Sequence, residues 1–235
     1  MARYLVQHGN EIVVQPVPAS LDSDVRVFLL GSCFGALLHQ RGLLVLHASG
    51  ICVHNRAVIF TGRSGAGKST LLGELLNRGH RMMADDVCAV VQDDDGTLVV
   101  LPAYPRTRLW ADAAQKLEID TGGMERTRPA LEKYERQIPE QFWDRPAPLQ
   151  RIYHLTSTNK DEIELDPLPR IPAFRSILHN TYRQLFLDGL EMRQPHFRLV
   201  SAVASTVGVT TVVRPSGAFR LAELADRIEA DLGLP

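Results

Sequence analysis

A stretch of glycines followed by a lysine and a serine is the part of the sequence best suited to chemistry. Residues 62–69 read Gly-Arg-Ser-Gly-Ala-Gly-Lys-Ser, which fits the phosphate-binding pattern G-x-x-x-x-G-K-[ST] at every position. The glycines let successive N–H groups point into one concavity, Lys68 brings positive charge to the β- and γ-phosphates, and Ser69 offers a hydroxyl to Mg²⁺. The pattern predicts an ATP and Mg²⁺ site formed by Gly62, Arg63, Ser64, Gly65, Ala66, Gly67, Lys68, Ser69 and Thr70. The alternative is a glycine-rich turn that binds nothing.

Two adjacent carboxylates follow at Asp85 and Asp86. They come directly after a short apolar run, where a carboxylate of a nucleotide-binding site meets the magnesium ion. One of the pair could also accept the proton of a hydroxyl substrate, which favours transfer to an alcohol. The alternative is a plain acidic turn, because aspartate is common in turns.

A histidine, His47, ends an apolar run and precedes Ala-Ser-Gly. On the sequence alone, a single histidine in such a place is more often a structural residue than a catalytic one.

The elements that must position these residues can be predicted from periodicity and turn signals. The P-loop, residues 62–70, is expected between the outgoing strand of a hairpin over 51–61 and a helix that ends at Gly79. The other predicted hairpins cover 3–17 and 87–101, with further strands at 43–47, 81–84, 149–156 and 208–214. Helices are predicted over 31–40, 173–187, 197–205 and 219–232. Residues 121–148 are rich in charge, proline and glycine and are expected to form a long loop, typical of a lid.

The composition is that of a globular protein, with 45% apolar and 23% charged residues in a chain of 235. A net charge of −1 argues against nucleic acid or an anionic membrane as a general partner. Cys33, Cys52 and Cys88 form no metal-ligand or disulfide pattern and are expected to be buried free thiols. With no apolar run long enough to span a bilayer, the sequence predicts a cytoplasmic protein.

The order of these motifs resembles the catalytic domain of HPr kinase/phosphorylase over residues 43–91. The resemblance lies in Leu-His-Ala-Ser-Gly at 46–50, the hairpin, the P-loop, and Ala-Asp-Asp-Val at 84–87. It implies that Lys68 is catalytic, that Ser69 and Asp85 bind the metal, that Asp86 accepts the proton, and that His47 belongs to the site.

Residues 102–110 lack the carboxylate of the family's glutamate-arginine signature, which removes one expected metal ligand and leaves open whether the chain has the phosphorylase activity. Arg106 and Arg108 in this stretch are predicted to stabilise phosphate charge, the alternative being solvated arginines on an edge strand. Lys133, in the expected lid, is predicted to close over the triphosphate. Tyr-Pro-Arg-Thr-Arg-Leu-Trp at 104–110 and His-Asn-Thr-Tyr-Arg at 179–183 are most similar to HPr-kinase-related proteins of lasso-peptide gene clusters.

The resemblance implies an α/β fold with a P-loop kinase core of the HPr kinase/PEP carboxykinase type, a mixed sheet and flanking helices. One domain is expected over 1–235, composed of a hairpin and helix at 1–42, the P-loop core at 43–120, the lid at 121–148 and an α/β portion at 149–235. The implied function is Mg-ATP-dependent phosphorylation of a serine hydroxyl in a peptide or protein, such as the C-terminal serine of a lasso-peptide precursor, and the family suggests a homo-oligomer. The alternatives are a small-molecule kinase, a PEP-carboxykinase-like enzyme and a nucleotide-binding regulator.

Overall fold

The structure, a computed structural model, describes residues 2–128, 131–216 and 220–234. The strands are β1 (Ala2–Gln7), β2 (Glu11–Pro16), β3 (Leu44–Leu46), β4 (Ala48–Val53), β5 (Arg56–Thr61), β6 (Arg81–Ala84), β7 (Cys88–Gln92), β8 (Leu98–Leu101), β9 (Arg106–Trp110), β10 (Arg126–Arg128), β11 (Leu131–Gln137), β12 (Ala147–Thr158), β13 (Glu164–Pro167) and β14 (Gly208–Pro215). The α-helices are α1 (Asp22–Phe28), α2 (Phe34–Gln40), α3 (Lys68–Asn77), α4 (Ala111–Lys116), α5 (Arg170–His179), α6 (Phe186–Gly189), α7 (Arg193–Thr206) and α8 (Leu221–Asp231). A π-helix, η1 (Leu29–Cys33), joins α1 to α2, and a 3₁₀ turn, η2 (Pro139–Gln141), follows β11.

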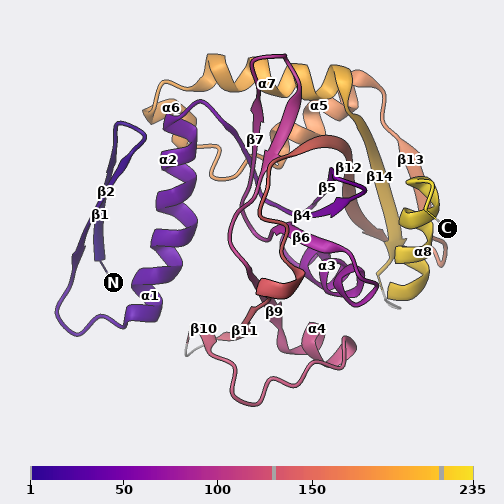
Figure 1. Cartoon of the computed structure of the whole chain (residues 1–235), viewed down its shortest axis with the longest axis horizontal. Coiled ribbons are helices and arrows are strands. Elements are labelled where there is room, and N and C mark those ends of the chain that lie inside the picture. The colour runs from indigo at the N-terminus through magenta and orange to yellow at the C-terminus, as the bar shows by residue number, and fades with distance from the viewer. Residues whose placement is uncertain (1, 129–130, 217–219, 235) are drawn as a thin grey trace.

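A mixed sheet of order β3-β7-β8-β12-β5-β4-β6 forms the centre of the molecule, and β14 and β13 extend it beside β12. The long strand β12 pairs in parallel with β5 and β14, but antiparallel with β8 at its beginning. Helices flank this sheet (Figure 1). The predicted α/β class, with a mixed sheet and flanking helices, is therefore confirmed.

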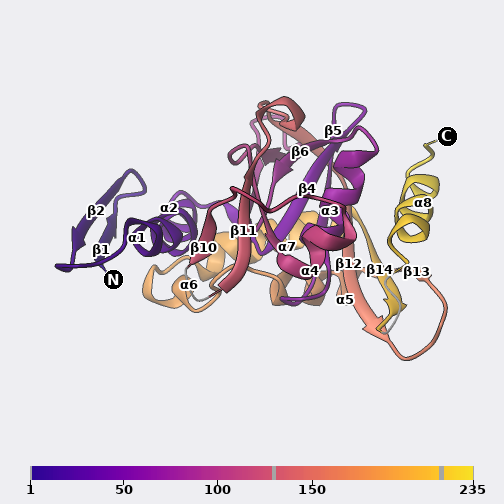
Figure 2. The same ribbon diagram turned by 90° about the horizontal axis from the view of Figure 1, so that it is seen from below.

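The burial of strand β5 shows that the sheet is covered on both faces. Its residues 57–61 are all buried, as expected for a strand that has a helical layer on each side. Ile59 packs in one apolar cluster with Val203 of α7. Phe60, which points to the opposite face, packs in a second cluster with Leu72 of α3 and Leu224 of α8. The sheet thus has α5 and α7 on one face and α3 and α8 on the other (Figures 1 and 2).

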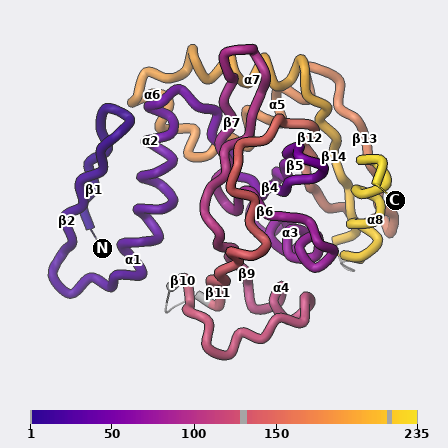
Figure 3. Tube along the Cα trace, in the orientation of Figure 1, coloured from indigo at the N-terminus to yellow at the C-terminus, as the bar shows by residue number. Residues whose placement is uncertain are grey.

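The N-terminal hairpin β1–β2 and the helices that follow it lie to one side of this layered core, as the chain trace shows (Figure 3). The contact of α2 with the core depends on a glycine. A Cβ added at Gly35 would lie 2.8 Å from the ring of Tyr182, which comes from the segment between α5 and α6. The absence of a side chain at Gly35 therefore allows the helix to approach Tyr182 closely.

We expect Gly35→Ala to destabilise the fold by about 1–3 kcal/mol, because the added methyl group overpacks a close contact. The free energy of unfolding in urea would measure the effect. Gly189→Ala is the matched control, since a Cβ at this helical glycine meets no atom within 4 Å, and it should be neutral or stabilising by up to about 1 kcal/mol. Equal stability of the two variants would contradict the packing argument.

Two of the predicted elements differ in the structure. The predicted helix over 173–187 is wrong beyond His179, because residues 180–185 form a bridge and turns between α5 and α6. The expected loop over 121–148 contains β10, β11 and η2, and β11 pairs with β9. The residues of β10 and β11 are mostly polar, so apolar periodicity does not reveal this ribbon.

The other predicted strands and helices are found with small shifts of their ends. The helix predicted over 219–232 is present as α8, and residue 219 lies outside the described residues. All three cysteines are free and buried, as predicted. None of the helices within the described ranges is both long and apolar enough to cross a membrane.

Candidate active site

The P-loop connects β5 to α3 and has the backbone conformation that its glycines allow. Gly67 has φ +98° and directly precedes α3. Gly62 has φ +142°, and a Cβ there would lie 2.6 Å from the backbone oxygen of Leu155 in β12. Both positions thus require glycine. The N–H groups at the beginning of α3 are then available to an anion.

The P-loop borders a cavity of about 330 Å³, called here the nucleotide cavity. It brings together most of the residues that the sequence predicts for the site. It is lined by His47, Ser64, Gly65, Gly67, Lys68, Ser69, Thr70, Asp85, Asp86, Trp110, Asp112, Ala113 and Lys133. Of the other P-loop residues, Ala66 packs against the core, whereas Gly62 and Arg63 line a neighbouring cavity.

Lys68 is buried, with 7% of its surface exposed. Its Nζ donates hydrogen bonds to the backbone oxygens of Gly62 (2.9 Å) and Arg63 (3.2 Å) and lies 3.2 Å from Nε2 of His47. Burial lowers the pKa of Lys68, while the carboxylates of Asp85 and Asp86 act in the opposite direction. The ammonium group is thus held at the loop by weak neutral acceptors, which a phosphate group could replace.

Ser69 and Asp85 form the part of the cavity that fits a magnesium ion. The Ser69 hydroxyl donates to Oδ1 of Asp85 at 3.0 Å, so its oxygen lone pairs stay available to a metal. The same Oδ1 accepts a hydrogen bond from Ser49 at 2.7 Å, and Oδ2 accepts one from the backbone N–H of Arg108 at 3.0 Å. Burial raises the pKa of Asp85 against these hydrogen bonds. A cation beside it would therefore favour the ionised form.

Within the described part of the chain, no three His, Cys, Asp or Glu side chains are grouped as a metal site. A hydroxyl and one carboxylate suit Mg²⁺, which usually takes few protein ligands and completes its shell with phosphate oxygens and water. The residues present therefore fit magnesium bound together with a nucleotide.

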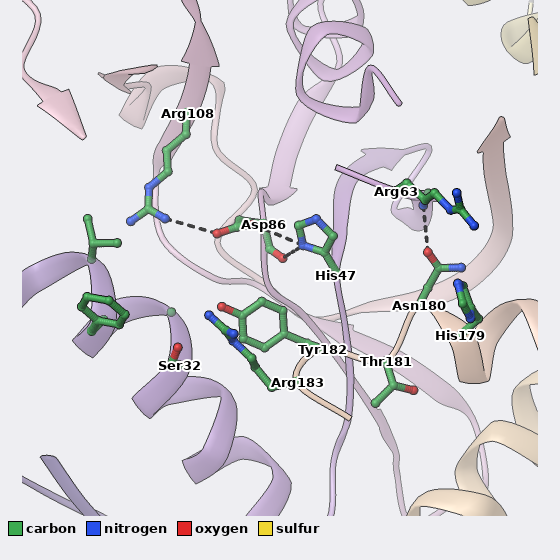
Figure 4. A pocket seen from close by; sticks show the side chains of 14 residues that line it. Ser32, His47, Arg63, Asp86, Arg108, His179, Asn180, Thr181, Tyr182 and Arg183 are labelled. Carbon is green, nitrogen blue, oxygen red and sulfur yellow. Dashed lines mark hydrogen bonds and ion pairs between the residues drawn. The ribbon is translucent and has the colours of Figure 1, made fainter. Parts of the chain in front are cut away.

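Asp86 lies between a histidine and an arginine. Its Oδ1 is 3.3 Å from Nδ1 of His47, and its Oδ2 is 3.2 Å from Nη1 of Arg108 (Figure 4). Burial acts to raise the pKa of Asp86, but the hydrogen bond and charge of His47, with the charges of Lys133 and Arg108, outweigh it and lower the pKa. The side chain is thus an ionised, oriented acceptor. The backbone at Asp86 has φ +78°, a left-handed conformation that is costly for a residue other than glycine and typical of functional sites.

The histidine connects the lysine to this carboxylate. Its Nδ1 also lies 3.0 Å from the backbone oxygen of Asp86, while Nε2 faces Lys68. His47 therefore lies beside Lys68 and Asp86 rather than in the apolar core, and its part in catalysis stays a prediction.

A carboxylate that the sequence analysis missed comes from β11. Glu135 forms ion pairs with Arg106 and Arg108 of β9, and the distance from its Oε1 to Nε of Arg108 is 3.3 Å. Both arginines are buried, so the alternative of solvated arginines is wrong. Arg108 reaches Asp86, but Arg106 lines neither cavity and stacks near Tyr104. No local signal marks Glu135, because only the pairing of β9 with β11 brings it to the site.

Lys133, on the same strand, already faces the nucleotide cavity. Its Nζ lies 5.6 Å from the centre of the Trp110 ring, and its charge acts on both aspartates. The placement agrees with a role beside the triphosphate. Closure of the 121–148 segment stays a prediction.

Next to the nucleotide cavity lies a larger one of about 460 Å³, called here the second cavity (Figure 4). His47 and Asp86 line both cavities. The rest of its lining comes from α1 and η1, the P-loop, β9 and the 179–183 turn. The lining residues are Val27, Phe28, Gly31, Ser32, His47, Gly62, Arg63, Asp86, Arg108, His179, Asn180, Thr181, Tyr182 and Arg183.

We expect a phosphate or sulfate ion to bind at the backbone N–H groups of residues 65–69 in crystals grown with such salts, because these groups and Lys68 form an anion site. Electron density at 1 mM to 100 mM phosphate would show it, with concentrations of about this order chosen to bracket weak anion binding. A Lys68→Ala crystal is the control and should lose the ion. An empty loop in the wild-type protein at the highest concentration would contradict the phosphate-site prediction.

The segment that carries the P-loop and the aspartate pair is similar to known proteins. Residues 42–106 match the family described as the HPr Serine kinase C-terminal domain. HPr kinase/phosphorylase of Geobacillus sp. (strain WCH70) is 44% identical over 54 residues, which cover 23% of this chain and 17% of that protein. The same enzyme of Listeria monocytogenes serotype 4a (strain HCC23) is 39% identical over 105 residues, covering 41% and 34%.

The chain therefore spans less than two thirds of the length of these relatives. Among solved structures, the Hpr(Ser) kinase/phosphatase of Coxiella burnetii aligns with 80% of this chain and 90% of its own, with a TM-score of 0.44 and 12% identity. The lysine, the serine and both aspartates of the site lie inside the matched segment. Residues 42–106 of this chain are thus related to the C-terminal domain of HPr serine kinases.

Proposed function

We propose that this protein is a Mg-ATP-dependent kinase that transfers the γ-phosphate to a serine hydroxyl of a peptide or protein. One observation carries the proposal: His47 and Asp86 lie where the nucleotide cavity and the second cavity meet. A phosphate at the P-loop and a hydroxyl in the second cavity would thus be neighbours of the same carboxylate. The relatives' names, HPr kinase/phosphorylase, support phosphotransfer to a protein.

In this proposal each part of the site has a separate task. The P-loop N–H groups and Lys68 hold the phosphates, Ser69 and Asp85 hold Mg²⁺, and Asp86 orients the acceptor hydroxyl. Magnesium supplies charge neutralisation on the phosphates when bound. Lys133 adds positive charge from β11. Phosphoryl transfer needs mainly positioning and electrostatic stabilisation, and in this proposal these residues supply both.

A finer proposal concerns the acceptor. The two stretches that resemble lasso-peptide kinases, 104–110 and 179–183, both contribute to the site through Arg108, Trp110 and the second cavity. This supports the C-terminal serine of a lasso-peptide precursor as the substrate. The cytoplasmic location and the homo-oligomer also remain proposals.

Incubation of the purified protein with γ-labelled ATP and candidate acceptors tests the proposal. The acceptors would include an HPr protein and the small peptides encoded by neighbouring genes. We expect label on a serine side chain and release of ADP. Label on a small metabolite would favour the small-molecule kinase, and ATP binding without transfer to any acceptor would favour a nucleotide-binding regulator.

A further inference from the structure

Asn180 is a buried polar residue in the wall of the second cavity. It directly follows helix α5, and 6% of its surface is exposed. Its backbone N–H donates to the backbone oxygen of Ser176 at 3.2 Å, and its side-chain Nδ2 donates to the same oxygen at 2.7 Å. The amide group is thus fixed at the end of the helix, and its oxygen Oδ1 is available to a group outside α5.

Two oxygens of Asn180 hold two parts of the site that are far apart in the sequence. Oδ1 accepts the N–H of Gly62, the first residue of the P-loop, at 3.0 Å. The backbone oxygen accepts the N–H of His47 at 2.8 Å. Asn180 can be seen beside the beginning of the P-loop in Figure 4. One buried residue therefore connects the P-loop to the strand end that carries the histidine.

These two hydrogen bonds belong to a closed ring of four residues. The backbone oxygen of Gly62 accepts a hydrogen bond from Nζ of Lys68 at 2.9 Å, and this Nζ lies 3.2 Å from Nε2 of His47. The N–H of His47 leads back to Asn180, while its ring lies 3.3 Å from the carboxylate of Asp86. The ring thus relates the lysine of the phosphate site to the carboxylate between the two cavities.

An amide group suits this place better than other polar groups. It accepts the N–H of Gly62 with one atom and donates to the oxygen of Ser176 with another. A carboxylate would place a negatively charged oxygen against the Ser176 oxygen. Alanine would leave the buried N–H of Gly62 without its partner, which is costly. The residue type at position 180 therefore decides whether the ring is complete.

We propose that Asn180 is a positioning residue for phosphotransfer, which fixes the beginning of the P-loop relative to His47 and thereby the γ-phosphate relative to Asp86. This rests on the kinase function proposed above. Asn180 reaches Lys68 and Asp86 only through Gly62 and His47. The N–H groups of the P-loop and Lys68 stay in place without it, so its loss should act on the transfer step rather than on ATP binding.

Asn180→Ala should lower the single-turnover rate by about 10²-fold, the loss that a misplacement of about 1 Å can cause. ATP should still bind stoichiometrically and with nearly unchanged affinity in calorimetry. Rates are counted per ATP-binding molecule, which removes the effect of partial unfolding. Asn77→Ala is the matched control, since Asn77 is an exposed asparagine at the end of α3 that lines neither cavity. A wild-type rate in Asn180→Ala, or a loss of ATP binding that accounts for the loss of rate, would overturn the inference.

Asn180→Asp adds a readout that depends on pH. In its protonated form the new carboxyl group offers the same acceptor and donor as the amide, whereas the ionised form lacks the donor. Burial raises the pKa of a carboxyl group, so we expect the rate relative to wild type to rise as the pH falls from about 8 to about 5. A general loss of stability would not produce this recovery. A ratio that stays constant over this range would contradict the positioning role.

Crystal structures separate the inference from the kinase function. In Asn180→Ala, Gly62 should move away from His47 by about 1 Å, the scale of displacement that affects rates. An unchanged separation would overturn the inference whatever the rate. A displacement in a protein that phosphorylates no acceptor would keep Asn180 as the residue that positions the P-loop and would overturn the kinase function.

A milder variant covers the case in which neither change at Asn180 gives a folded protein. Nδ1 of His154 lies 3.2 Å from Nδ2 of Asn180. His154→Leu removes this contact and leaves the hydrogen bond to Gly62. It should lower the transfer rate by about 3–10-fold, the range typical of one hydrogen bond, at unchanged ATP affinity. A wild-type rate in His154→Leu would then count against the inference.

Discussion

Lys68→Ala should reduce phosphotransfer by at least about 10²–10³-fold, the loss typical of removing one group that stabilises charge in a transition state. The buried ammonium group lies among the P-loop carbonyls and His47, where no other lysine of the described chain replaces it at the loop itself. Lys133, which also lines the cavity, comes from β11. Its charge alone should therefore not rescue the variant.

Single-turnover transfer of labelled phosphate would measure this loss, and thermal unfolding would check the fold. The melting temperature should stay the same or rise, because alanine removes the desolvation cost of a buried charge. Lys160→Ala, a change at an exposed lysine paired with Glu164, is the control and should leave transfer unchanged. Turnover near the wild-type rate in Lys68→Ala would exclude the proposed kinase mechanism.

Asp86→Asn should leave the affinity for ATP nearly unchanged and lower the rate of transfer by about 10²–10⁴-fold, the usual contribution of a general base. The amide keeps the shape of the side chain but cannot take the proton. The substitution also removes the ion pairs of Asp86 with His47 and Arg108, so the acceptor hydroxyl should be oriented less well. Because the pKa of Asp86 is lowered, the carboxylate is ionised at neutral pH in the wild-type protein.

The neighbouring change Asp85→Asn provides the contrast. Asp85 contacts Ser69 rather than the second cavity, so its replacement should raise the magnesium concentration needed for transfer. ATP affinity by calorimetry and single-turnover rates over a range of magnesium concentrations would separate the two effects. Rescue of Asp86→Asn by magnesium, with Asp85→Asn inactive throughout, would exchange the two roles. Normal rates in both variants would show that the acidic pair is only a turn.

The sequence predicted the elements around the P-loop well, because their signals are local. Consecutive residues are enough to predict the P-loop, the helix after it and the strand before Asp85. The 179–183 wall of the second cavity could not be predicted in this way. The 179–183 turn interrupts a stretch with helical periodicity, and its conformation depends on hydrogen bonds to Val45 and His47, more than 130 residues earlier.

The carboxylate that pairs with Arg106 and Arg108 could not be predicted from local signals either. The stretch 102–110 itself contains no carboxylate, but Glu135 of β11 forms an ion pair with Arg108. Pairing of β9 with β11 depends on side-chain packing and the course of the chain rather than on a sequence motif. The sequence therefore shows which residue types are present, but it does not show which strand brings them to the site.

The close contact between Gly35 and Tyr182 joins an N-terminal helix to the turn beside the second cavity. Helix α1 and the π-helix η1, which precede Gly35, also contribute walls to that cavity. All of these parts lie outside the segment 42–106 that matches the HPr kinase family. Under the proposed function, substitutions in α1 and η1 should therefore change which acceptor is phosphorylated more than they change ATP binding. Related chains that share the P-loop and the aspartate pair would then be expected to diverge mainly in what they phosphorylate.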